Sequence, residues 1–172
     1  MLPRMARMVH LEPLSRDRVA ERDARFQRMA MGLAGIRIVA GGYWLVHLRH
    51  RLPPDFGRTR ADGLLRDLQT GAEHGLQPFA WLADQVLVPY DRTTGWVMFA
   101  MQAAAGVLLV VGYRTTLGAA LGTALAVIDA ALLAPAPGAW HGGFVLLLAV
   151  NVVLLLAPSQ LRWSVDAMAG RV

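Results

Sequence analysis

The sequence contains neither cysteine nor lysine. The lack of cysteine excludes disulfide bonds, thiolate metal sites, iron–sulfur clusters and thiol catalysis. The lack of lysine means that all 17 basic residues are arginine, and they occur beside abundant alanine, glycine and valine, a composition typical of a GC-rich bacterial genome. No basic helix interleaved with stacking aromatic residues is present, so the net charge of +5 does not indicate nucleic-acid binding.

Apolar residues dominate what is present. They make up 55% of the 172 residues, and the mean hydropathy of +0.40 is well above that of a soluble domain of this size. The apolar surplus must therefore face lipid. We predict an all-α fold, a polytopic bundle of four transmembrane helices. Each apolar segment is close to the ~20 residues that cross a ~30 Å hydrocarbon core, and the four lie at about 30–48, 95–111, 115–133 and 139–157.

The positions of arginine predict the orientation of this domain, which covers residues 30–157. Segment 1–29 contains seven arginines and no apolar core, which excludes a signal peptide and indicates a cytoplasmic helix or arm. Its arginines are expected to bind anionic lipid headgroups in preference to a partner protein. Arg114 lies in the turn after the second span, and the predicted interfacial tail 158–172 is also basic, whereas the turn between the third and fourth spans has no arginine. We therefore predict a bacterial inner-membrane protein with both termini in the cytoplasm.

The long loop 49–94 is predicted to lie outside the cell, because its six arginines and six acidic residues cancel. In this loop, Thr59 is expected to cap an amphipathic helix that ends at Gln69. A second interfacial helix is predicted from Pro78 to Val88. Two interpretations remain open: the helices form a lid over the outer mouth of the bundle, or they only cover the ends of the spans.

A few polar residues occur inside the apolar spans. An ionisable group there costs at least ~2.5–3.5 kcal/mol, so such groups tend to face the interior of a bundle. At a rise of ~1.5 Å per residue, Asp129, Gln102 and Asn151 share a layer in the outer half of the membrane, whereas Arg37 lies nearer the cytoplasm. This layer is a candidate site for ligand binding or proton relay. Aromatic and histidine side chains are expected to roof it, namely Trp44, His47, Trp140 and His141.

Each of these residues also admits a structural interpretation. Asp129 is either a protonated hydrogen-bond partner of Asn151 that holds helices together or a binding or relay group, and both alternatives remain open. For Gln102 and Asn151 alone, helix–helix hydrogen bonding is favoured. Arg37 is interpreted as a structural intramembrane charge. The two histidines have no carboxylate at ligand spacing, so no metal site is predicted.

Several short motifs follow one another between residues 32 and 166. They are RIVAG from Arg37, GLQPF from Gly75, VPY from Val88, GVLLVVGYRT from Gly106 and SVD from Ser164. In their order and spacing they resemble the DoxX/DoxD family of small four-helix membrane proteins, which includes the small subunit of a thiosulfate:quinone oxidoreductase. The family's span-one arginine corresponds to Arg37. Its frequent glutamate in the second span corresponds to Gln102, which puts the family's activity in question for this chain.

The resemblance implies an integral membrane subunit of a quinone-linked electron-transfer complex. A quinone or another small hydrophobic ligand would then occupy the outer pocket, with Asp129 and Gln102 forming hydrogen bonds or relaying protons. The chain has no cofactor ligands of its own, so electrons would come from membrane partner subunits, and enzymatic activity would at most belong to the complex. The alternative is a non-catalytic accessory subunit that packs against a larger membrane complex; a transporter is disfavoured because few polar residues line any path.

Overall fold

The computed structural model describes residues 16–58, 63–137 and 141–157, and the regular structure of these segments is entirely helical. Three helices are long and apolar enough to cross a membrane, namely the Asp23–Leu48 part of the first helix and the whole of the fourth and fifth α-helices. The sixth is apolar but has 16 residues, about 24 Å of helix. The elements are α1 (Arg16–Leu48), α2 (Leu64–His74), α3 (Phe79–Leu82), the π-helix η1 (Ala83–Leu87), α4 (Asp91–Val111), α5 (Thr115–Leu133) and α6 (His141–Leu156).

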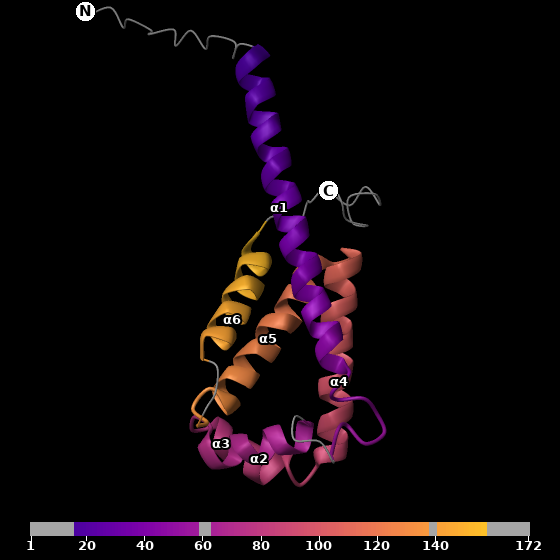
Figure 1. Cartoon of the computed structure of the whole chain (residues 1–172), viewed down its shortest axis with the longest axis vertical. Helices are drawn as coiled ribbons and strands as arrows, with labels where there is room; N and C mark the ends of the chain where they lie inside the picture. The colour runs from indigo at the N-terminus through magenta and orange to yellow at the C-terminus, as the bar shows by residue number, and fades with distance from the viewer. Residues whose placement is uncertain (1–15, 59–62, 138–140, 158–172) are drawn as a thin grey trace, which may run out of the picture.

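The long helices form a bundle that is covered at one end by the short ones (Figure 1). Helix α1 packs mainly against α4, and α5 packs against both α4 and α6. Helices α2, α3 and η1 lie across the end of the bundle, and we call them the lid. Helices α2 and α3 pack against α5, and η1 packs against α2 and α3. The N-terminal part of α1 extends well beyond the other end of the bundle. The predicted arm helix and first span are therefore one continuous helix of 33 residues.

The sequence pattern located the ends of the central helices well. The predicted span 115–133 coincides with α5, and the span 95–111 ends where α4 ends, although α4 begins one turn earlier, at Asp91. The intervening turn reverses the chain through two left-handed residues, Gly112 at φ +76° and Arg114 at φ +45°. Glycine adopts this conformation readily, and it commonly terminates helices in this way.

The lid differs in part from its prediction. Helix α2 begins at Leu64, after Gly63, and continues to His74, so the predicted bounds of Thr59 and Gln69 are wrong by about five residues. Thr59 itself lies outside the described residues. Leu64 and Leu68 are buried, which shows that apolar packing on the bundle sets the position of this helix. The segment of the second predicted helix, from Pro78 to Val88, contains α3 and η1, and its second half is a π-helix.

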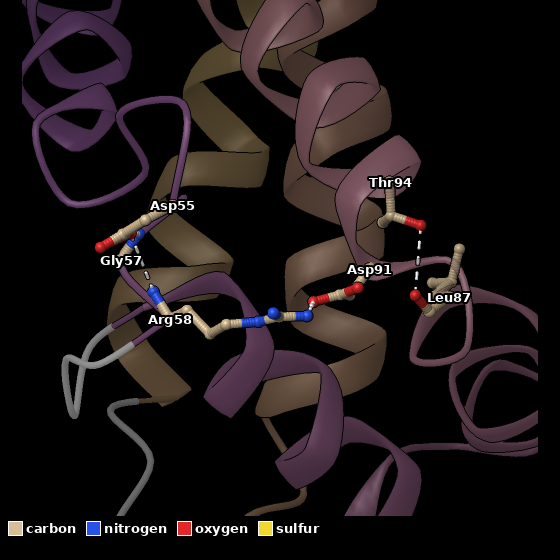
Figure 2. Close-up of polar contacts among 6 residues, drawn as sticks. All are labelled: Asp55, Gly57, Arg58, Leu87, Asp91 and Thr94. Atoms are coloured by element: carbon tan, nitrogen blue, oxygen red, sulfur yellow. Dashed lines mark hydrogen bonds and ion pairs between the residues drawn. The ribbon is translucent and has the colours of Figure 1, made fainter.

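A loop that follows α1 is fastened to the beginning of α4 (Figure 2). The Asp55 carboxylate accepts hydrogen bonds from the backbone N–H groups of Gly57, at 2.7 Å, and Arg58, at 3.3 Å. Arg58 forms an ion pair with Asp91 in the first turn of α4. The neighbouring residue Phe56 is buried against Gly95 of α4. A Cβ added at Gly95 would lie 2.7 Å from the Phe56 ring. The loop therefore holds the lid end of α1 beside α4.

Candidate functional site

Arg51 is a buried cation that joins three parts of the fold. It follows directly after α1, and its side chain is 2% exposed. Its Nη2 atom donates to Asp67 Oδ2 of α2 at 2.7 Å and lies 3.8 Å from Asp129 Oδ1 of α5. Two carboxylates thus share one guanidinium nitrogen. This cluster ties the lid to the long helices.

The guanidinium of Arg51 is not fully satisfied by these contacts. Its Nε and Nη1 atoms are buried, and no hydrogen-bond partner for either is found among the described residues. A buried donor without a partner costs about 1–3 kcal/mol, and more when it is charged. Folded proteins rarely leave such groups unpaired unless a ligand or water completes them. Arg51 therefore has two buried donor nitrogens without a partner among the described residues, at the edge of a cavity that it lines.

A cavity of about 830 Å³ ends at this cluster. It lies between α1, α5 and α6, and Arg51, Asp67 and Asp129 line its polar end. The Tyr43 and His47 rings stack beside them, with centroids 5.7 Å apart and planes at 11°. The remaining wall is almost entirely apolar, including Ile36, Val39, Leu133, Phe144 and Leu147. A mostly apolar cavity with a few convergent polar groups is the usual form of a small-molecule site.

The structure brings only some of the predicted site residues to this cavity. Asp129 and His47 line it. Trp44 and Asn151 are fully buried in the packed interior, where Trp44 Nε1 donates to Asn151 Oδ1 at 3.4 Å. Asn151 also donates to the Leu147 carbonyl oxygen of its own helix at 2.8 Å, so it is the bond with Trp44 that joins α6 to α1.

Asn151 lies at a different depth from Asp129. Its Oδ1 atom faces Gly122 of α5. A Cβ added at Gly122 would lie only 2.1 Å from this oxygen. Gly122 precedes Asp129 by seven residues, which is about 10 Å along a helix. The predicted single layer is therefore wrong in this respect: Asp129 belongs with Arg51 at the lid, and Asn151 belongs with Trp44 farther from it.

The other predicted residues take separate positions. Gln102 is fully buried in α4, and its side-chain oxygen and nitrogen have no hydrogen-bond partner among the described residues. The guanidinium of Arg37 lies against Gly112, where a Cβ would be 2.7 Å from its Nη1 atom. A cation is favourable there, at the C-terminus of α4, which fits a structural role. His141 is the first residue of α6, and its side chain, like the whole of Trp140, lies outside the described part of the chain.

Gly122 is the closest contact point between α5 and the Trp44–Asn151 pair. An added Cβ would also lie 2.9 Å from Trp44 Nε1. We expect Gly122→Val to destabilise the protein by about 1–3 kcal/mol, because two fully buried side chains would have to move. Thermal unfolding in mild detergent measures the effect. Gly32→Val is the control, since a Cβ at Gly32 meets no atom within 4 Å, and an equal loss in both variants would contradict the packing argument.

The composition of the site limits its chemistry. Among residues 16–58, 63–137 and 141–157, no group of three or more histidine, aspartate or glutamate side chains is placed to hold a metal ion. The cluster of Arg51, Asp67 and Asp129 supplies hydrogen-bond donors from a guanidinium and acceptors from two carboxylates, at the end of an apolar cavity. No protein-family model, curated protein or solved structure matches the chain.

Proposed function

We propose that this chain is a four-span subunit of the bacterial inner membrane, with both termini in the cytoplasm and the lid on the outer face. The balance of arginines in the loops supports this orientation. Helix α6 is the most apolar of the helices and packs along α5, which supports its role as the fourth span. Phe26 and Met29 of α1 are exposed and offer an apolar surface to a partner subunit.

The function that the cavity supports best is the binding of a membrane quinone within a quinone-linked electron-transfer complex. A single observation carries this proposal: buried Arg51, with two donors unused, lies at the end of an apolar cavity of about 830 Å³. A quinone has a ring with carbonyl acceptors and an apolar tail, and these match the two ends of the cavity. The volume is within the ~300–1,000 Å³ that is usual for small-molecule sites.

The charges at the polar end favour a neutral headgroup. Arg51 already faces the carboxylates of Asp67 and Asp129, so an anionic headgroup would meet two like charges for one opposite charge. A quinone carbonyl would accept from Arg51, and the hydroxyl of the reduced quinol would donate to Asp129. Reduction of a quinone consumes two electrons and two protons. The electrons would come from a partner subunit, and Asp129 is the carboxylate placed to exchange protons with the ring.

Titration of the purified protein with a short-chain ubiquinone and its quinol tests this function. We expect saturable binding at micromolar concentrations, measured by calorimetry or by quenching of tryptophan fluorescence. Asp129→Asn should weaken quinol binding by about tenfold, or ~1.4 kcal/mol, because an amide replaces the charged acceptor. The matched control is Asp84→Asn, at an exposed site on η1. Absence of saturable binding, or equal affinities in the two variants, would refute the proposal.

A further inference from the structure

A second cavity lies between the lid and the bundle. It has a volume of about 400 Å³ and lies between α2, α3 and η1 on one side and α4 and α5 on the other. No residue lines both this cavity and the quinone cavity. Helix α5 contributes to both, but with different side chains. The cavity is therefore a separate site. The apolar side chains that form its wall include Leu68, Phe79, Val86, Val97, Met98 and Met101.

The interior of this second cavity contains almost nothing that could recognise a polar group. Thr94 contributes a hydroxyl, but that hydroxyl donates to the Leu87 carbonyl oxygen at 3.2 Å (Figure 2). The other polar side chains of the wall, Tyr90 and Thr93, lie at the lid end, beside the first turn of α4. An occupant could therefore gain little besides van der Waals contacts between hydrocarbon groups inside the cavity.

The length of the cavity corresponds to one leaflet of a bilayer. Along α4 its wall extends from Tyr90 to Met101, eleven residues or about 16 Å. Half of a ~30 Å hydrocarbon core is about 15 Å. Arg92, exposed and adjacent to Thr93, places a positive charge at the same end of α4 as Tyr90. The geometry thus combines an apolar slot of one leaflet's depth with an exposed cation in the first turn of α4, next to Thr93.

We infer that this second cavity binds one acyl chain of a phospholipid from the leaflet on the lid side, with the lipid phosphate beside Arg92. An acyl chain supplies hydrocarbon along the full depth of the slot. Its headgroup remains at the membrane surface, where tyrosine and arginine side chains commonly meet lipid headgroups. The bound lipid would fill the space between the lid and the spans and so fix the lid against α4.

Native mass spectrometry of the detergent-purified full-length chain, titrated with palmitoyl-oleoyl-phosphatidylglycerol, tests this inference. We expect Val97→Trp to weaken the tightest lipid adduct by about tenfold or more, because the indole would occupy the slot. Val107→Trp is the matched control, since Val97 and Val107 are 52% and 50% exposed on the same helix and only Val97 lines the cavity. Both variants should first elute as folded monodisperse protein.

A second comparison tests the position of the headgroup. Arg92→Gln should weaken phosphatidylglycerol severalfold and leave dioleoylglycerol, which has no phosphate, unchanged. Equal lipid binding by Val97→Trp and Val107→Trp would overturn the acyl-chain site. Equal losses for both lipids in Arg92→Gln would overturn the phosphate contact. Because the two cavities are lined by different residues, a failure here is distinguishable from a failure of quinone binding.

Discussion

Replacing Arg51 with methionine is expected to lower the free energy of unfolding by about 3–5 kcal/mol. The substitution keeps much of the side-chain volume but removes the charge that Asp67 and Asp129 share. Two carboxylates would then lie close together without a cation, in a site with little access to water. Breaking a buried ion pair from one side has this large cost because it leaves an uncompensated charge. Thermal unfolding of the purified protein in mild detergent measures it.

The fold supplies a matched control for this prediction. Arg58 pairs with Asp91 at the same end of the bundle, but its side chain is 59% exposed. Arg58→Met should cost no more than ~1 kcal/mol, because exposed ion pairs contribute little. Adding Asp129→Leu to Arg51→Met should recover part of the loss, since it removes one of the stranded charges. Similar losses for Arg51→Met and Arg58→Met would show that the buried cluster has no special role.

Sequence periodicity predicted the long helices well because lipid-facing segments carry a simple signal. A run of apolar residues bounded by Gly112 and Arg114 determines where α4 ends and α5 begins, with no need for tertiary information. The start of α2 was harder to predict. Thr59 is a good capping residue, yet the helix begins at Leu64, where the leucines first reach the surface of the bundle. Tertiary packing outweighed capping propensity there.

The candidate site was predicted only in part, for a reason of the same kind. Asp129 was identified because a carboxylate within an apolar span is conspicuous. Arg51 and Asp67 belong to a loop segment with many other charges, where nothing in the sequence distinguishes a buried arginine from an exposed one. The one available signal is that Asp67 adjoins Leu68 on the buried side of α2. Depth counting also assigned Asn151 to the layer of Asp129, because helix tilt and the exact ends of α6 are not readable from sequence.

Substituting Gly35 with tryptophan is expected to lower the affinity for a quinone by about a hundredfold, or ~2.7 kcal/mol. Gly35 lines the cavity between α1, α5 and α6, and a Cβ at this position would meet no atom within 4 Å. The indole can therefore enter the cavity without disturbing the helix. It would exclude the apolar part of the ligand from the wall formed by Ile36 and Val39, and the hydrophobic contribution of that contact would be lost.

Gly42→Trp separates this effect from a general effect of a bulky residue on α1. A Cβ at Gly42 also meets no atom within 4 Å, but Gly42 is not part of the cavity wall. Both substitutions replace a helical glycine with the same side chain, so their influence on helix stability should be similar. Calorimetric titration with a short-chain ubiquinone should show a large loss of affinity for Gly35→Trp alone. A loss of the same size in Gly42→Trp, or none in either, would mean that the quinone does not bind in the cavity between α1, α5 and α6.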